Sequence, residues 1–207
     1  MDEALLCDIT IDASKELGYG EFSPLHTYLL KRIKTGESLT LHLPGEKETI
    51  DKMLISLSLF KAPQAFEGSP RVLWITDTTD RARKIADQLK HLCRRSEIAV
   101  ELADDKGKMI EQRNHIFEGA DIIIGNPKRI HDLYNQNGIH VNQLKLVIVD
   151  SLNAFVKQPT LLQFIRRVNE SLPKCQHIFI QEDKQERISN FIEELVPFYK
   201  VIDQNSL

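Results

Sequence analysis

The chain has 207 residues, of which 42% are hydrophobic and 28% are charged, an ordinary composition for a globular protein. Its formal net charge of −3, from 27 basic and 30 acidic residues, argues against strong non-specific binding to nucleic acid, because a generic binder carries a clear basic excess. The length fits one medium domain or two very small ones, and it suffices to bury a core without disulfide or metal support.

The cysteines and the N-terminal segment bear on the compartment. Cys7, Cys93 and Cys175 are far apart and lack metal-ligand spacing, so free thiols in a reducing cytoplasm are expected. The first ten residues are acidic and lack the basic and apolar regions of a signal peptide. No run approaches the roughly 18 apolar residues of a membrane span. We therefore expect a cytoplasmic protein without a membrane partner.

Short apolar, β-branched runs recur along the chain and predict strands. They are residues 38–42, 71–76, 98–102, 121–125, 144–150, 177–181 and, more weakly, 199–203. Several are apolar at consecutive positions, a pattern typical of strands covered on both faces in a parallel sheet. Trp74 lies inside one such run and is predicted to belong to the core.

Segments with helical periodicity lie between these runs. They are residues 24–34, 47–60, 79–92, 158–171 and 184–196. Thr78 or Thr79 can cap the start of the third of them. Phe155, Phe164 and Phe191 recur at helix or strand spacing and are also predicted to be core. Strands that alternate with helices predict an α/β fold, with a mostly parallel open sheet and helices on both faces.

In such sheets, ligands bind beyond the carboxyl ends of the strands. The segments that follow the predicted strands are HLPGEKET (42–49), DTTDRA (77–82), ADDKGK (103–108), NPKR (126–129), DSLN (150–153) and QED (181–183). In order and spacing, they resemble the motif series of the first RecA-like domain of DEAD-box RNA helicases. The resemblance implies a RecA-like fold of the P-loop NTPase type. We expect residues 1–207 to form one such domain, with no second helicase domain in the chain.

The resemblance also implies a nucleotide site, on His26, Gly45, Glu48, Thr49 and Asp150. The family has its adenine-reading glutamine at the first position and its phosphate-loop lysine at the third. It binds magnesium through the aspartate at the last. Glutamate in place of lysine turns attraction to phosphate into repulsion, and two unit charges about 4 Å apart interact by about 4 kcal/mol at a surface-like dielectric.

The water-activating glutamate of the family falls on Ser151, whose unassisted hydroxyl stays protonated at neutral pH. No catalytic residue is therefore expected. For Gly45 and Thr49, the alternative is an ordinary strand-to-helix turn with a cap. For Asp150, the alternative to a magnesium ligand is a strand-end aspartate that is left by ancestry or caps a helix.

Three residues are candidates for binding RNA. DTTDRA stands in the P-T-R-E-L-A place and keeps Thr78, while NPKR stands in the T-P-G-R place and keeps Arg129, with Lys128 beside it. The alternative for Lys128 and Arg129 is a solvated first helical turn. Asp104 and Asp105 replace the family's Gly-Gly pair, where carboxylates repel phosphate. They are predicted to be a solvated acidic loop end.

These substitutions predict a degenerate DEAD-box-like domain without ATPase or unwinding activity, which acts as a binding or regulatory module for a protein or RNA partner. No cofactor is expected. The alternative is residual binding of Mg-ATP or Mg-ADP, as part of an ATP-dependent RNA helicase assembled with a second RecA-like domain. A third hypothesis is RNA binding without nucleotide dependence, led by Lys128 and Arg129.

Overall fold

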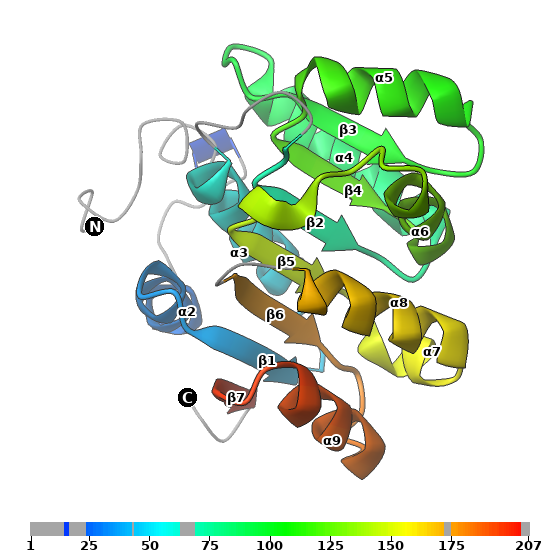
Figure 1. The fold of residues 1–207 in the computed structure, drawn as a ribbon. Coiled ribbons are helices and arrows are strands. Elements are labelled where there is room, and N and C mark those ends of the chain that lie inside the picture. The colour runs from blue at the N-terminus through cyan, green and yellow to red at the C-terminus, as the bar shows by residue number, and fades with distance from the viewer. Residues whose placement is uncertain (1–14, 17–23, 43, 63–68, 172–174, 204–207) are drawn as a thin grey trace.

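The computed structural model describes residues 15–16, 24–42, 44–62, 69–171 and 175–203 (Figure 1). These residues form a seven-stranded sheet in the order β3-β4-β2-β5-β6-β1-β7. Every pair of neighbouring strands is parallel. The strands are β1 (Ser38–His42), β2 (Val72–Ile75), β3 (Val100–Ala103), β4 (Ile122–Gly125), β5 (Leu146–Val149), β6 (Gln176–Ile180) and β7 (Tyr199–Asp203). The predicted parallel α/β sheet is confirmed.

Helices connect these strands. They are α2 (Pro24–Lys34), α3 (Lys47–Lys61), α4 (Thr79–Cys93), α5 (Met109–Gly119), α6 (Pro127–Asn135), α7 (Leu152–Val156), α8 (Pro159–Glu170) and α9 (Glu186–Leu195), with a short 3-10 turn η2 (Val141–Gln143). The five helices predicted from periodicity are present. The periodicity did not predict α5, which buries few apolar residues and leaves Ile110 and Phe117 exposed.

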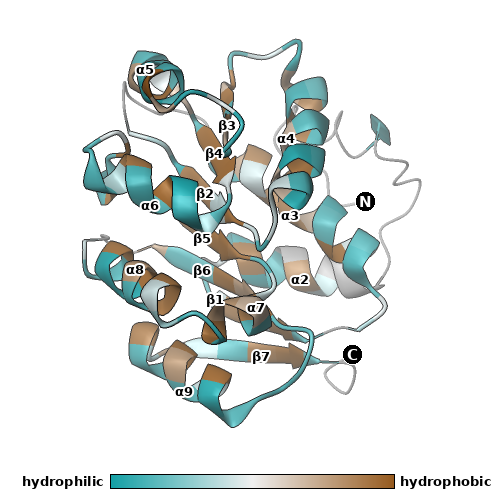
Figure 2. Ribbon diagram, turned by 90° about the vertical axis from the view of Figure 1, so that its right-hand side faces the viewer, coloured by the Kyte–Doolittle hydropathy of each residue, from teal (hydrophilic) through white to brown (hydrophobic). Residues whose placement is uncertain are grey.

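The core lies in two layers, one on each face of the sheet. Alternate residues of each central strand point to opposite faces, so Trp74 packs with α2, α3 and α4, whereas Leu73 packs with α5 to α9. Figure 2 shows the apolar strands between these two layers, with the hydrophilic helix surfaces turned outward. Trp74, Phe155, Phe164 and Phe191 are all buried, as predicted for the core.

Parallel strands bring all their carboxyl ends to one edge of the sheet. The loops that follow β1, β2, β3, β4, β5 and β6 therefore meet at this edge, which holds the six segments that follow the predicted strands. Among the described residues, none of the helices combines the length and apolar character needed to span a bilayer.

Candidate functional site

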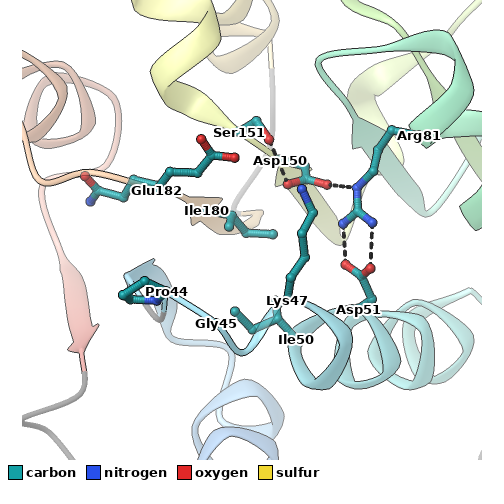
Figure 3. Close-up of a pocket in the computed structure, with 11 residues that line it drawn as sticks. Pro44, Gly45, Lys47, Ile50, Asp51, Arg81, Asp150, Ser151, Ile180 and Glu182 are labelled. Carbon is teal, nitrogen blue, oxygen red and sulfur yellow. Dashed lines mark hydrogen bonds and ion pairs between the residues drawn. The ribbon is translucent and has the colours of Figure 1, made fainter.

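A cavity of about 270 Å³ lies at the carboxyl edge, between the ends of β5 and β6 and the first turns of α3 and α4 (Figure 3). Its lining combines apolar side chains with two cations and three carboxylates. The lining residues are Pro44, Gly45, Lys47, Ile50, Asp51, Arg81, Asp150, Ser151, Ile180, Gln181 and Glu182.

Arg81 connects three elements at the wall of this cavity. Its Nη1 donates to Asp51 Oδ2 at 2.6 Å, and its Nη2 donates to Asp51 Oδ1. Its Nε donates to Asp150 Oδ2 at 2.7 Å. All three side chains are largely buried, with 10% of Arg81, 13% of Asp51 and 2% of Asp150 exposed. The guanidinium thus bridges two buried carboxylates, and the pairing with Asp51 is bidentate, the strong form of this contact.

Burial and neighbouring charges shift the acidity of these groups. Burial raises the pKa of Asp150, Arg81 pulls it back down, and the nearby Asp51 carboxylate raises it further, so the net shift is upward. Burial alone would lower the pKa of Arg81, but its hydrogen bonds and ion pairs with Asp51 and Asp150 outweigh burial and raise it. Arg81 therefore stays protonated, and it is the cation that neutralises this wall.

The same geometry decides whether the site fits magnesium. Mg²⁺ requires a near-octahedral shell of oxygen ligands, usually including one or two carboxylates. One oxygen of Asp150 accepts from Arg81 and the other from the Ser151 hydroxyl at 3.3 Å. Among the residues that the structure describes, no group of three or more His, Cys, Asp or Glu side chains is arranged to hold a metal. As arranged, these residues do not fit magnesium, and Arg81 supplies the positive charge.

The start of α3 corrects the predicted role of Glu48. Its side chain is 83% exposed and pairs with Lys52 at 2.7 Å, and it does not line the cavity. Lys47 lines the cavity instead, and its amine points toward Asp150 (Figure 3). The reason is helical geometry, because residues four apart share a face. Lys47 and Asp51 thus turn inward while Glu48 and Lys52 turn outward, so the predicted repulsion by Glu48 is not part of this cavity.

The remaining predicted nucleotide residues are only partly brought together. Gly45 lines the cavity with φ +88°, a backbone conformation that favours glycine. Thr49 lies in α3 and is half-buried outside the cavity lining. The side chain of His26 lies outside the described residues, although its backbone belongs to α2.

The DSLN segment turns sharply after β5. Ser151 adopts the left-handed conformation, with φ 60° and ψ 49°, and starts the short helix α7. Asn153 then donates from Nδ2 to the Asp183 carbonyl at 2.9 Å and accepts the Glu182 N–H at 2.8 Å. A neutral amide supplies both a donor and an acceptor, so Asn153 joins this segment to the QED segment.

The predicted RNA-facing residues have different environments. Thr78 is exposed and caps α4, accepting the Arg81 N–H at 3.3 Å. Lys128 is exposed on the first turn of α6. Arg129 is buried and donates from Nη2 to the Gly107 carbonyl at 3.2 Å. The alternative of a solvated turn therefore describes Lys128 but not Arg129.

The acidic loop end after β3 was predicted to be solvated, and this prediction was wrong for Asp104. Its side chain is buried, pairs with Arg83, and accepts the Gly107 N–H at 3.0 Å. Asp105 is half-exposed and lies 3.6 Å from Arg129 Nε. The buried position follows from the turn at Gly107, which folds the loop back over the end of β3.

Comparison with known proteins agrees with this architecture. A sequence model of the DEAD/DEAH box helicase family matches residues 52–188, more than half of the chain. The chain belongs to the DEAD/DEAH box helicase family. Within that family, its fold is that of the N-terminal RecA-like domain.

Several family members and solved structures are similar to the chain. The ATP-dependent RNA helicase RhlB of Vibrio atlanticus is 27% identical over 184 residues, which are 82% of this chain and 41% of the relative. Saccharomyces cerevisiae Dbp5, solved bound to RNA and ADP BeF3, superposes with a TM-score of 0.80 at 15% identity, over 99% of this chain and 52% of that one.

A DEAD box protein from the hyperthermophile Methanococcus jannaschii superposes with a TM-score of 0.78 at 15% identity, over 96% of this chain and 54% of that one. At these identities, the superpositions establish the fold. This DEAD-box-family chain spans about half the length of the solved relatives.

The motif comparison located the cavity but missed the residues that neutralise it. Arg81 falls on the leucine of the family's P-T-R-E-L-A motif, so a charge in an apolar place was a signal that could have found it. Asp51 lies one helical turn after Lys47, which places both on one face of α3. Arg83 lies two residues after Arg81 in α4, and no family motif marks it.

Proposed function

We propose that this chain is a nucleotide-independent member of the DEAD/DEAH box helicase family, without ATPase or unwinding activity, that acts as a binding or regulatory module. The observation that carries the proposal is the guanidinium of Arg81 between Asp51 and Asp150. A protein cation there leaves the cavity wall neutralised without a metal ion. Nucleotide hydrolysis in this fold would also require a water-activating base, and Ser151 cannot serve as one.

The partner is proposed to be a protein or RNA. Relatives of this family are named as ATP-dependent RNA helicases, and the solved Dbp5 structure contains RNA, which supports RNA as one candidate. A net charge of −3 weakens generic attraction to nucleic acid, which favours a protein or a locally defined RNA contact.

A second candidate function is weak nucleotide binding as one half of a helicase that assembles with a second RecA-like domain. Two features of the cavity support it. Lys47 places an amine in the lining, and the buried Gln181 side chain has an Oε1 with no partner among the described residues. Both could contact a polar ligand. Gly45 also lines the cavity, and because it has no side chain, its backbone is accessible there.

Thermal denaturation with millimolar ATP or ADP, with and without Mg²⁺, distinguishes the two. A ligand present at about a hundred times its Kd stabilises the folded state by about 2.7 kcal/mol, which shifts the melting temperature measurably. The proposal predicts no shift with either nucleotide, and no RNA-stimulated release of phosphate from ATP.

Two variants control this experiment. A shift that Lys47→Ala removes and Lys52→Ala leaves intact would replace the proposal with the second candidate, because only Lys47 lines the cavity. RNA-stimulated ATP hydrolysis that Asp150→Ala abolishes would contradict the proposal, because it would mean that the chain has kept its catalytic function.

A further inference from the structure

The cavity at the carboxyl edge keeps two charged side chains that the ion pairs of Arg81 do not engage. Arg81 pairs with Asp51 and Asp150 at the cavity wall. The charged side chains that remain in the lining are those of Lys47 and Glu182. Within the part of the chain that the structure describes, neither of them forms a hydrogen bond or an ion pair through its side chain. The cavity therefore has one cation and one anion that a ligand can engage.

These two charges lie beside the turn that follows β5. The Lys47 amine points toward Asp150, and the Glu182 carboxylate is directed toward Ser151 (Figure 3). Because Asp150 and Ser151 are consecutive, the two charged groups approach the same small space, one from α3 and the other from the end of β6. A ligand in this space meets a positive and a negative group at once.

The start of α3 adds further donors beside Lys47. Glu46 precedes the helix, and its side chain makes no capping hydrogen bond to the N–H groups of the first turn. Gly45 lines the cavity with φ +88° and has no side chain to cover this end of the helix. Because the N-terminus of a helix carries a partial positive charge, Lys47 and these N–H groups together favour an oxyanion such as a carboxylate.

Gln181 and Glu182 present acceptors at the β6 end of the cavity. Gln181 is 5% exposed, and its Oε1 has no hydrogen-bond partner among the described residues. A buried acceptor without a donor costs free energy, so a ligand N–H is favoured there. The described residues hold no group of three or more His, Cys, Asp or Glu side chains fit for a metal ion. An organic ammonium, with its three N–H donors, therefore suits these two acceptors.

The size of the cavity and its apolar surface restrict the ligand further. The cavity holds about 270 Å³, below the roughly 300–1,000 Å³ of pockets that take drug-sized ligands. Pro44, Ile50 and Ile180 supply its apolar surface. A matching ligand is therefore small and has an apolar part.

The summed charge of the lining separates a zwitterion from a nucleotide. Three carboxylates stand against two cations, and these five residues are Asp51, Asp150, Glu182, Lys47 and Arg81. A nucleoside triphosphate would bring several negative charges into a lining that is already negative, whereas a zwitterion brings no net charge. A small zwitterion is therefore the better match.

We propose that this cavity binds a free α-amino acid with an apolar side chain. The ligand carboxylate contacts Lys47 and the first turn of α3, and the ligand ammonium donates to Gln181 and Glu182. The ligand side chain packs against Ile50 and Ile180. The inference rests on the function proposed above, because a nucleotide would compete for the same cavity.

Thermal denaturation of the full chain with millimolar apolar L-amino acids identifies the ligand, and calorimetric titration then compares it with two partial analogues. For L-leucine these are 4-methylpentanoate, which lacks the ammonium, and 3-methylbutylamine, which lacks the carboxylate. Each analogue is expected to bind at least about tenfold more weakly, because one charge-assisted contact is lost. An analogue that binds as tightly as the amino acid would overturn the proposal, as would unchanged melting with every apolar L-amino acid.

Four variants place the ligand in the cavity. Glu182→Gln and Lys47→Ala should each weaken binding of the amino acid about tenfold. Asp183→Asn and Lys52→Ala are the matched controls, because each removes the same charge outside the lining, and both should bind as the natural chain does. Equal weakening in Asp183→Asn and Glu182→Gln would overturn the proposal, since it would reflect net charge alone. Unchanged binding in both Glu182→Gln and Lys47→Ala would overturn it as well.

Parallel measurements with ATP and ADP separate this site from the function proposed above. Melting that no nucleotide and no amino acid changes would overturn the amino-acid site and leave the nucleotide-independent function standing. A rise in melting temperature with ATP or ADP alone would overturn both. A rise with an apolar amino acid alone is the result expected here.

Discussion

Arg81 neutralises two buried carboxylates that the fold brings together from segments far apart in sequence. Asp51 lies 30 residues before it and Asp150 lies 69 residues after it. Removing one partner of a buried ion pair leaves an uncompensated charge and typically costs about 3 kcal/mol. Arg81→Ala is therefore expected to lower the free energy of unfolding at neutral pH by about that amount, as measured by urea denaturation.

The loss should depend on pH. In Arg81→Ala, Asp150 stays buried and loses the cation that lowers its pKa, so the pKa of Asp150 in the folded state rises further above that in the unfolded chain. A carboxyl with a raised folded pKa binds protons more tightly in the folded state, so stability increases as pH falls toward the unfolded value of about 4. The difference in free energy of unfolding between Arg81→Ala and the natural chain should therefore shrink as the pH falls toward that value.

Arg187→Ala is the control for this experiment, because Arg187 is exposed on α9. It should change stability by no more than about 0.5 kcal/mol at either pH. A deficit in Arg81→Ala that matches that of Arg187→Ala, or that is the same at every pH, would show that Arg81 does not neutralise the two aspartates.

Single-residue chemistry was only partly predictable from the sequence. The position of Asp150 at a strand end and of Gly45 in a strand-to-helix turn followed from pattern alone. The residue at which α3 begins decides whether Lys47 or Glu48 faces the cavity. The motif alignment placed Glu48 there, whereas the structure places Lys47 there. The contact of Arg81 with Asp150 requires tertiary structure, because no local pattern relates residues so far apart.

At the level of elements, close packing of β3 on β4 places the acidic loop against α6. Gly125 ends β4, and a methyl group added there would collide with the carbonyl oxygen of Ala103. Because a backbone atom cannot yield as a side chain can, Gly125→Ala should cost about 3 kcal/mol in urea denaturation.

The double variant Gly125→Ala/Ala103→Gly tests the cause. Removing the side chain at Ala103 leaves its carbonyl oxygen in place, so the double variant should stay as unstable as Gly125→Ala. Full recovery of stability would mean that the two side chains, rather than the strand backbones, set the spacing of β3 and β4.

The elements themselves were largely predictable. Consecutive apolar residues marked the strands, and clear apolar stripes marked α4, α8 and α9. The helices that the apolar pattern did not predict, α5 and α7, lack an apolar stripe for physical reasons. α7 has five residues, which is too short for a periodic stripe, and α5 turns Ile110 and Phe117 to solvent.

At the scale of the whole molecule, one sheet edge gathers the segments that the family resemblance singled out, and ion pairs within the chain join the buried charges there. Arg81 lies between Asp51 and Asp150 in the cavity, and Asp104 and Asp105 lie against Arg83 and Arg129. Because Arg81 already pairs with both Asp51 and Asp150, we propose that the cavity has no need of a divalent cation.

Electron paramagnetic resonance of Mn²⁺ tests this claim most directly, because Mn²⁺ prefers the same oxygen ligands as Mg²⁺. The natural chain should bind no Mn²⁺ at the cavity. Arg81→Leu should gain one Mn²⁺ site, which Asp150→Asn in the same background should remove. Binding of Mn²⁺ by the natural chain at a site that Asp150→Asn abolishes would show that Arg81 does not take the place of a metal ion.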